Sequence, residues 1–278
     1  MPAFSVVIVS YNTREDLRLC LNALRESTLP AEVVVVDNAS TDGSAEMVRQ
    51  HFPDVILIEP GRNTWFCGGN NIGVAAASGE YALLLNPDTI APPDALATLA
   101  GFLDTHPDYA GATLQLRYPD GGIQRTCSRA PSLRYLLLTQ TALRWLLPGP
   151  RRRAEERHWY SGWNRTTDYD VEAVPGSCVC MRRADLWLDD SLRLYYNEDD
   201  LAQRFAGRKF RFLAAPAIIH REKAATRSAT ASRLYFTDLL TYTRKWHGSG
   251  AATLMWALSR PLAWGIALRW KLGRRSTR

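Results

Sequence analysis

The sequence predicts an α/β protein with a doubly wound, mostly parallel sheet and a helical C-terminal extension. Two short aliphatic runs, 33–36 and 81–85, contain no polar alternation, which is typical of strands covered on both faces. Strand-like and helical segments alternate through residues 1–110, as a doubly wound sheet requires. Both aliphatic runs also lead straight into a carboxylate, at Asp37 and Asp88.

The first half of the chain has a regular order of elements. A loop rich in glycine and asparagine, 61–71, separates its third strand from its third helix. The expected strands are 5–10, 33–36, 55–58 and 81–85, and the expected helices are 15–25, 44–50 after a turn at 40–44, 72–78 and 93–105.

The pattern is looser over 111–170. One apolar helix is expected at 133–147, and a mobile loop is expected to hold Arg151–Arg153 and 159–168. Regular structure resumes later in the chain. Its expected segments are 171–181, 216–220 and a helical stretch over 232–271.

Composition indicates a globular protein of a reducing compartment. The chain has 278 residues, of which 46% are hydrophobic and 22% charged, enough for one large domain with an appendage. Its five cysteines are an odd number without a CxxC pair, so buried free thiols are expected. The first residues lack a secretory signal pattern. We therefore expect a cytoplasmic protein.

The acids at the strand ends predict a ligand site, because open parallel sheets bind ligands beyond the carboxyl ends of their strands. No glycine-rich phosphate loop follows the first strand, where Ser10-Tyr11-Asn12 stands instead. Asp37 is then expected to accept hydrogen bonds from a base or ribose, or else only to cap a helix. Asp88 offers a hard oxygen ligand for Mg²⁺ or Mn²⁺, or else forms an Asn-Pro-Asp turn.

Two further features carry chemistry. Residues 195–201 (YYNEDDL) place three acids beside two tyrosines, and burial next to apolar rings raises a carboxyl pKa, which suits a general base. These acids could instead only complement a helix dipole. His220 ends an apolar segment at the expected sheet edge, where an imidazole could complete a metal site or be structural.

Taken together, these segments resemble family 2 glycosyltransferases of the GT-A fold, in particular the rhamnosyltransferase-like members that build bacterial surface polysaccharides. The resemblance covers residues 3–225 and implies a GT-A domain at 1–230, with a nucleotide-binding half at 1–110 and an acceptor half at 111–230, followed by a helical, basic extension at 231–278. The motifs, in chain order, are SVVIVSYN, VVVVDNASTDGS, NTWFCGGNNIG, LLLNPDT, VPGSCVCMRRA, NEDDL and a P-x-x-x-H ending.

The resemblance implies a role for each motif. Asp37 and the turn Ser10, Tyr11 and Asn12 would contact the base and ribose of the donor, and the loop from Asn63 to Asn71 would lie along it. Asn86 and Asp88 stand at the family's DxD position, with Asp88 and His220 holding Mn²⁺ or Mg²⁺. These donor-binding and metal positions are Ser10, Tyr11, Asn12, Asp37, Asn63, Asn71, Asn86, Asp88 and His220.

The acidic motif would hold the catalytic base, and two departures from the family pattern matter. Asn86 replaces the first acid of DxD, so the metal has fewer protein carboxylates. Alignment on Asp200-Leu201 makes Glu198 the base, whereas matching the Glu-Asp pair, the more recognisable half of the motif, selects Asp199, which the sequence favours. The implied mechanism is single displacement with inversion, from a dTDP- or UDP-sugar, with dTDP-rhamnose one candidate donor, to a hydroxyl of a glycan or lipid-linked saccharide.

The C-terminal segment predicts contact with a membrane surface. Residues 249–272 are apolar, but Arg260-Pro261 interrupts them, so a helix lying in the headgroup layer on the inner face of the plasma membrane fits better than a spanning one. Packing on the protein's own core or in a homodimer is the alternative. The tail is basic through Arg269, Lys271, Arg274, Arg275 and Arg278.

Three other functions were weighed against the glycosyltransferase hypothesis. Nucleic-acid binding is disfavoured because no helix-turn-helix, zinc pattern or RNP-like strand accompanies the basic clusters. A sugar-nucleotide nucleotidyltransferase would carry a glycine-rich basic loop after the first strand, which this chain lacks. A non-catalytic relative that only binds nucleotide-sugar remains open, and transfer assays would separate it from an enzyme.

Overall fold

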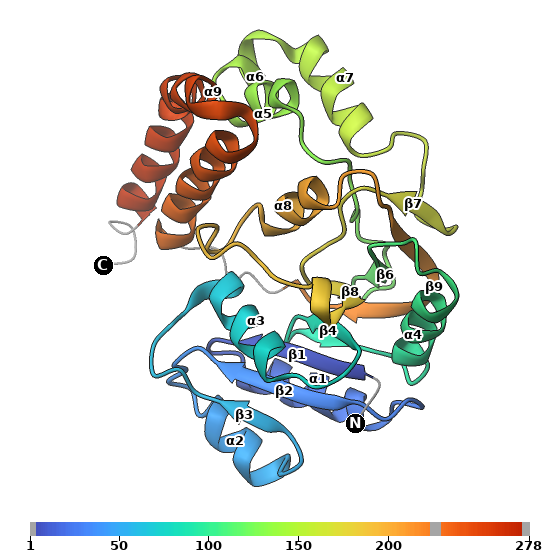
Figure 1. The fold of residues 1–278 in the computed structure, drawn as a ribbon. Helices are drawn as coiled ribbons and strands as arrows, with labels where there is room; N and C mark the ends of the chain where they lie inside the picture. The colour runs from blue at the N-terminus through green and yellow to red at the C-terminus, as the bar shows by residue number, and fades with distance from the viewer. Residues whose placement is uncertain (1–3, 223–228, 274–278) are drawn as a thin grey trace.

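The computed structural model describes residues 4–222 and 229–273, with side chains as far as 266. The chain forms a central mixed sheet with helices on both faces and a helical layer at one end (Figure 1). In the first half the elements are β1 (Phe4–Ser10), α1 (Arg14–Arg25), β2 (Glu32–Asp37), α2 (Ser44–His51), β3 (Ile56–Ile58), α3 (Trp65–Ala76), β4 (Tyr81–Leu85), β5 (Thr89–Ile90) and α4 (Ala95–Thr105).

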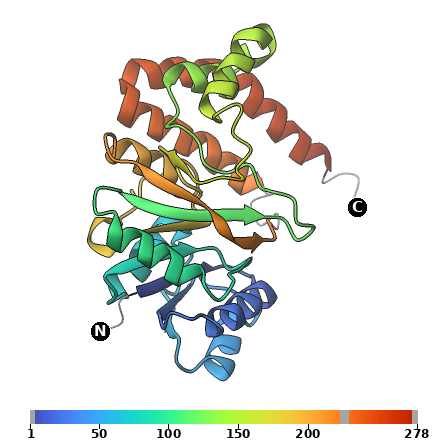
Figure 2. The ribbon, with the colours of Figure 1, turned by 90° about the vertical axis from the view of Figure 1, so that its right-hand side faces the viewer.

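The second half completes the sheet and builds the helical layer. Figure 2 shows this layer, which contains α5, α6, α7 and α9, at the opposite end of the molecule from β2, β3 and α2. The elements are β6 (Gly111–Arg117), α5 (Leu133–Gln140), α6 (Leu143–Leu146), α7 (Pro148–His158), β7 (Tyr169–Val171), β8 (Cys178–Arg182), a 3₁₀ turn (Arg183–Asp185), α8 (Asn197–Arg204), β9 (Phe210–His220) and α9 (Ala229–Gly273).

The sheet is mostly parallel, as expected. Its order is β3-β2-β1-β4-β8-β6-β9-β5, with β7 also paired to β9. Strands β1, β2, β3, β4, β6 and β9 run one way, whereas β5, β7 and β8 run the other. The carboxyl ends of β1, β2 and β4 therefore lie at one edge, where parallel sheets place their ligands.

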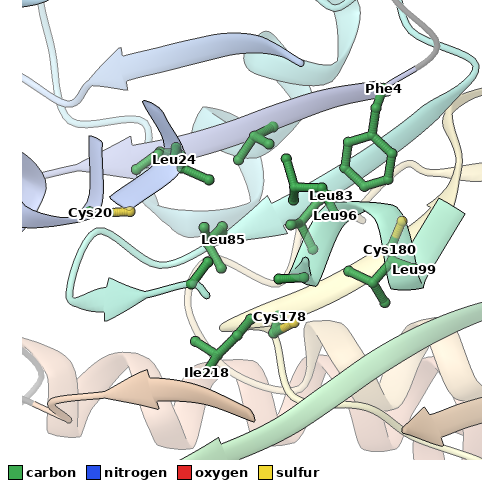
Figure 3. Close-up of a cluster of buried hydrophobic side chains, with 14 of the residues drawn as sticks. Phe4, Cys20, Leu24, Leu83, Leu85, Leu96, Leu99, Cys178, Cys180 and Ile218 are labelled. Carbon is green, nitrogen blue, oxygen red and sulfur yellow. The ribbon is translucent and has the colours of Figure 1, made fainter. Parts of the chain in front are cut away.

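The aliphatic strands are covered on both faces because alternate side chains enter two different cores. Val35 and Leu83 pack with α1, α2 and α4 on one face, as Figure 3 shows for Leu83 and its neighbours. Val34 and Leu84 pack on the other face with α3 and α9. The described cysteines are all free and buried, as expected. Double coverage explains why these strands show no polar alternation.

The glycine- and asparagine-rich segment 61–71 is mostly helix rather than loop, because α3 begins at Trp65. Its glycines allow the helix to approach the sheet. A Cβ at Gly69 would lie 2.8 Å from Val9 Cγ1, and one at Gly73 would lie 2.3 Å from Val7 Cγ1. In a sequence pattern, glycines indicate the end of a helix. Here they are needed inside the helix because no larger residue would fit against the sheet.

Three further expectations are corrected. The helix expected at 133–147 is divided, because Thr141 is extended between α5 and α6. Arg151–Arg153 lie in helix α7, which begins with Pro148, and not in a loop. The segment 171–181 is not continuous, since β7 ends at Val171 and β8 begins at Cys178.

The C-terminal helix α9 is broken at Gly248, whose φ of 87° is left-handed. Before the break, Tyr242 is fully buried with the core of α8 and β8, so this part of α9 packs on the protein itself. After it, Trp256 and Trp264 are exposed. The basic side chains expected at the end of the tail, with Trp270, lie outside the described side chains. Among the described residues, no helix combines the length and apolarity needed to cross a membrane.

Candidate active site

The ends of β1 and β2 bring together the first group of expected site residues. Ser10 and Asp37 are register partners, and both are buried. The turn after β1 is held by Asn12, which has a left-handed φ of 55° and accepts a 2.7 Å hydrogen bond from the Thr41 N–H. Tyr11 is half exposed beside this turn. The turn therefore forms a rigid wall next to Asp37.

The Asp37 carboxylate has one free position. Its Oδ1 accepts a 2.8 Å hydrogen bond from the Ser40 N–H, whereas its Oδ2 is buried and has no hydrogen-bond partner. A buried carboxylate oxygen without a partner costs free energy, so such atoms are uncommon unless a ligand satisfies them. The free Asp37 oxygen can therefore accept an N–H or O–H from a ligand, as its predicted donor-binding role requires.

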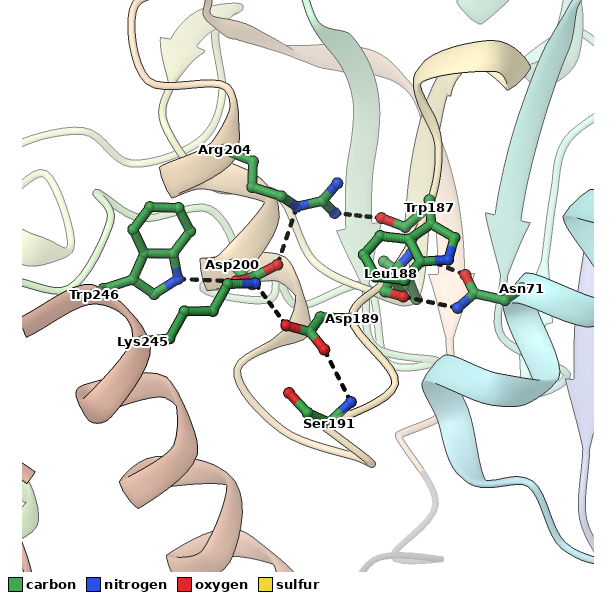
Figure 4. Close-up of polar contacts among 9 residues, drawn as sticks. All are labelled: Asn71, Trp187, Leu188, Asp189, Ser191, Asp200, Arg204, Lys245 and Trp246. Carbon is green, nitrogen blue, oxygen red and sulfur yellow. Dashed lines mark hydrogen bonds and ion pairs between the residues drawn. The ribbon is translucent and has the colours of Figure 1, made fainter. Parts of the chain in front are cut away.

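The segment before α3 is fixed beside these strand ends. Asn38 accepts hydrogen bonds from the backbone and side chain of Thr64, and Asn63 caps the Trp65 N–H at 2.8 Å. Asn71 uses both ends of its amide on Leu188, where it donates to the carbonyl and accepts from the N–H (Figure 4). Its observed contacts therefore hold the 186–191 loop, and its donor-binding role stays a prediction.

Asp88 and His220 meet across the pairing of β5 with β9. The Asp88 Oδ1 and His220 Nε2 atoms are 3.3 Å apart, and both side chains are largely buried. Gln124 donates to the His220 backbone carbonyl at 2.8 Å, so its amide oxygen faces His220 Nδ1 at 2.9 Å and must accept from it. This fixes the imidazole tautomer. In the neutral ring, Nε2 presents a lone pair to a carboxylate oxygen.

Two acceptors facing each other suit a shared cation. Adjacent ligands of an octahedral ion with bonds of about 2.1 Å lie about 3 Å apart, which is close to the observed separation. The Gln124 contact also matches the second-sphere hydrogen bond that orients metal-binding histidines. Within the described ranges, no group of three or more His, Cys, Asp or Glu side chains could hold a metal by itself. The pair fits an ion whose remaining ligands are diphosphate and water.

A short chain of contacts connects this edge to helix α8. The Asn86 N–H donates to the Ser177 carbonyl at 3.1 Å. The next residue back, Gly176, directs its N–H toward the Glu198 carboxylate and favours the ionised form. A Cβ at Gly176 would lie 3.2 Å from Phe66 Cζ and 3.3 Å from Asn197 Oδ1, so this glycine packs closely against α3 and α8. The α8 acids therefore lie close to the carboxyl end of β4.

Helix α8 directs its three acids to different surroundings. Burial raises the pKa of Glu198 despite the two nearby N–H groups. Burial, followed by the charges of Glu198 and Asp200, raises the pKa of Asp199 well above its usual range. Burial and then the Glu198 charge raise the pKa of the Cys67 thiol on α3. Glu198 is thus the acid of α8 that faces α3 and the ends of the first-half strands.

The third acid, Asp200, is structural. Its fully buried carboxylate accepts from Arg204 Nε at 3.0 Å, Lys245 Nζ at 2.7 Å and Trp246 Nε1 at 2.8 Å, as Figure 4 shows. Lys245 also pairs with Asp189 at 2.6 Å. These bonds tie α8 to α9 and to the 186–191 loop. Both carboxylate oxygens of Asp200 are therefore engaged by the protein itself.

A cavity of about 410 Å³ adjoins the remaining acids. Glu198 and Asp199 form part of its wall, together with several aromatic rings and with small polar and aliphatic side chains. Aromatic rings offer flat apolar faces against which the C–H face of a sugar can pack. The wall includes Tyr135, His158, Trp159, Tyr195, Tyr196 and Tyr235.

Sequence reasoning did not identify several residues of this site. Gln124 falls in the segment where the pattern is loose, and no local signal marks it as a partner of His220. Asn38 was visible only as part of the VVVVDNAS motif. The aromatic wall comes from separate segments, so only the paired tyrosines before Glu198 could have indicated it.

Comparisons with known proteins identify the family of the chain. The model of the family described as Glycosyl transferase family 2 matches residues 5–187. The N-acetylglucosaminyl-diphospho-decaprenol L-rhamnosyltransferase of Mycobacterium tuberculosis is 25% identical, over 93% of this chain and 90% of its own length. Glycosyltransferase AglE of Haloferax volcanii is 34% identical over 44% of this chain, and the match spans only 42% of AglE.

Solved structures show the same fold. The mannosyltransferase PcManGT from Pyrobaculum calidifontis, solved with GDP-Man and Mn²⁺, has a TM-score of 0.56 at 17% identity and is similar over 100% of this chain and 76% of its own. Staphylococcus aureus TarS 1-349 with UDP has a TM-score of 0.51 at 18% identity, over 85% of this chain and 65% of its own. Since the family model covers well over half of the sequence, the chain belongs to glycosyl transferase family 2.

Proposed function

We propose that the protein is an inverting glycosyltransferase that moves a sugar, with rhamnose the first candidate, from a nucleotide-diphosphate donor to a hydroxyl of a lipid-linked saccharide. The observation that carries the proposal is the convergence of chain-distant groups. Asp37, the Asp88–His220 pair and Glu198 adjoin one edge of the sheet, and an aromatic cavity lies beyond them. The proposal assigns Asp37 to the base, the Asp88–His220 pair to the diphosphate and the cavity beside Glu198 to the acceptor.

The donor would bind at the ends of β1, β2 and β4. The free Asp37 Oδ2 can accept the ring N–H of uracil or thymine, which suits a UDP- or dTDP-sugar. Ser10, Tyr11 and Asn12 would flank the base and ribose, and Asn63 and the start of α3 would lie along the diphosphate. The N-terminus of α3 adds a partial positive charge that favours a phosphate there.

Asp88 and His220 would hold a divalent cation together with the donor diphosphate, with Asn86 beside them. Mn²⁺ or Mg²⁺ supplies charge neutralisation for the leaving diphosphate when bound. Gln124 keeps the His220 Nε2 lone pair directed at the site. A test independent of turnover is Mn²⁺ binding measured by electron paramagnetic resonance. Asp88→Asn should weaken it, and unchanged Mn²⁺ affinity in this variant would refute the assignment.

Glu198 is the better candidate for the catalytic base. It lies on the donor side of α8, and its pKa is raised while the Gly176 N–H keeps the ionised form accessible. It would take the proton of the acceptor hydroxyl as that oxygen attacks the anomeric carbon opposite the diphosphate. Burial, with the charges of Glu198 and Asp200, raises the pKa of Asp199, which in its neutral form would hold acceptor hydroxyls by donating its own proton. This reverses the slight sequence preference for Asp199.

The acceptor proposal rests on the mycobacterial relative and on the surface of the helical layer. That relative's name describes a diphospho-decaprenol-linked acceptor. In this chain, Trp145, Leu146, Trp256 and Trp264 are exposed on α6 and α9, and α6 is joined to α9 by the Ala142–Leu258 backbone bond. We expect this surface to meet the headgroup layer at the inner face of the plasma membrane. A homodimer through α9 would compete with it.

The proposal is tested by screening nucleotide-sugars for Mn²⁺-dependent protection against unfolding and for transfer to prenyl-diphosphate-linked N-acetylglucosamine. Glu198→Gln should lose at least about a thousandfold in transfer while donor protection is retained. The matched amide substitution at the next residue, Asp199→Asn, should lose much less transfer activity. If Glu198→Gln retained transfer activity, Glu198 would be excluded as the catalytic base. Donor protection without transfer to any acceptor would instead favour a non-catalytic relative.

A further inference from the structure

A second cavity, of about 640 Å³, lies between α5 and α7 and is lined by arginines. Arg129, Arg134, Arg153 and Arg157 contribute to its wall, whereas its only acid is Glu172. Arg129 already pairs with Glu172 at 3.5 Å. The cavity therefore carries an excess of positive charge, and nothing in the donor site uses it.

Helix α7 shows how that charge is arranged. Arg151 and Arg152 pair with Glu155 and Glu156 four residues later, which are ordinary helix-surface pairs. Arg153 and Arg157 are also four residues apart, but they are like charges on the same face, and none of the ion pairs among the described residues includes either. Such a pair destabilises a helix. An anion between them would remove the penalty.

The arginine cavity lies directly beside the aromatic cavity and shares part of its wall. Tyr135 and His158 line both, stacked at a centroid distance of 3.8 Å. His158 is only 7% exposed, and its Nδ1 is buried without a hydrogen-bond partner. Burial, followed by the charges of Arg125 and Arg129, lowers the pKa of His158 to about 4, so the ring is neutral at physiological pH. The two rings therefore form a thin, neutral wall, with the arginines on one side and the Glu198 cavity on the other.

We infer that the α5–α7 cavity binds the diphosphate group of the acceptor, with the acceptor sugar in the aromatic cavity beside Glu198. This inference rests on the proposed function, since it requires a saccharide that carries a diphosphate at its reducing end. Arginines recognise phosphate oxygens through paired N–H donors. The exposed Trp145 and Leu146 of α6 adjoin the start of α7 in the chain, so the lipid chain would leave the cavity toward the surface expected to meet the membrane (Figure 1).

The test compares two variants of the full chain that each lose arginine charge from α7. Arg153→Ala/Arg157→Ala removes two guanidinium groups from the cavity wall. Arg151→Ala/Arg152→Ala removes the same amount of charge from arginines that are paired along the helix. Inorganic diphosphate binding is measured calorimetrically with chelator present, so that the metal-dependent donor site stays empty. We expect saturable binding that weakens roughly tenfold or more in the first variant and less than about twofold in the second.

Thermal unfolding separates binding from a structural role. Without ligand, Arg153→Ala/Arg157→Ala should melt at the same or a higher temperature, because a repulsive pair is removed and alanine favours helix. Added diphosphate should stabilise the wild type and not this variant. A lower melting temperature without ligand would assign these arginines to folding and overturn the inference.

Two further arms identify the source of the phosphate. Phosphatidylglycerol vesicles that bind through Arg153 and Arg157, with no binding of inorganic diphosphate, would make the cavity a membrane contact and overturn the inference. In transfer assays, the wild type should prefer prenyl-diphosphate-linked N-acetylglucosamine over an alkyl glycoside of the same sugar, and the cavity variant should lose that preference. Equal preference in both would also overturn it, whereas absence of any transfer would count against the proposed function instead.

Discussion

Replacing Asp200 with asparagine should destabilise the protein by about 3 kcal/mol. Removal of one partner from a buried ion pair costs about 3–5 kcal/mol, because the other charge is left uncompensated. Asp200 is fully buried and pairs with Arg204 and Lys245, whose side chains are 23% and 32% exposed. Both cations can recover some hydration, so the lower end of the range applies.

The assay is urea unfolding followed by tryptophan fluorescence, together with the melting temperature. At this chain length, about 3 kcal/mol corresponds to a fall of about 6–12 °C. Asp189→Asn is the matched control. Asp189 shares Lys245 but is 18% exposed, so its loss should cost only about 1 kcal/mol.

The reasoning would be refuted if Asp200→Asn and Asp189→Asn had the same effect, or if Asp200→Asn lay within about 1 kcal/mol of the wild type. The network would then stabilise no more than a surface pair does. A change in the slope of the unfolding free energy against urea concentration would indicate that α9 separates before the sheet unfolds.

Three other outcomes are expected. Burial raises the pKa of Asp170, but its hydrogen bonds from Lys209, Arg211 and Tyr109 outweigh burial and leave the pKa below 3.8. The stability that these bonds provide is complete above that pH and is lost as the pH falls through and below it. In acid titrations followed by circular dichroism, the stability advantage of the wild type over Asp170→Asn should therefore shrink. Gly73→Ala, whose Cβ would lie 2.3 Å from Val7, should cost about 1–3 kcal/mol in urea unfolding, whereas Gly101→Ala on α4, with open space around it, should be neutral or stabilising. Asp199→Asn should raise the melting temperature at neutral pH, because a carboxyl with a raised pKa costs stability above its ordinary pKa; a lower melting temperature would contradict this.

The strands and most helices of the first half could be predicted because each is marked by one strong local signal. Aliphatic runs gave β2 and β4, and leucine spacing gave α1. The start of α3 could not be predicted, because glycine is a poor helix former and its use against β1 depends on a neighbour distant in sequence. Helix α7 was missed for a similar reason, since Pro148 and the arginine run read as a loop unless i,i+4 pairs are considered.

The site follows the same division between local and long-range information. Asp37 and Asp88 were predictable because strand ends share one edge of a parallel sheet. His220 was predictable because its strand ends beside them. The role of Gln124 depends on a hydrogen bond across 96 residues of sequence separation, for which the chain carries no local signal.

The choice between Glu198 and Asp199 depends on the rotation of one helix. Successive residues of an α-helix are about 100° apart. Asp200 is held toward α9 by Lys245 and Trp246, so Glu198 projects about 200° away from it, to the side of Cys67 and the donor edge. Asp199 falls between the two. The buried structural acid therefore sets which of its neighbours faces the donor edge, and the sequence motif without that anchor leaves both candidates for the proposed base open.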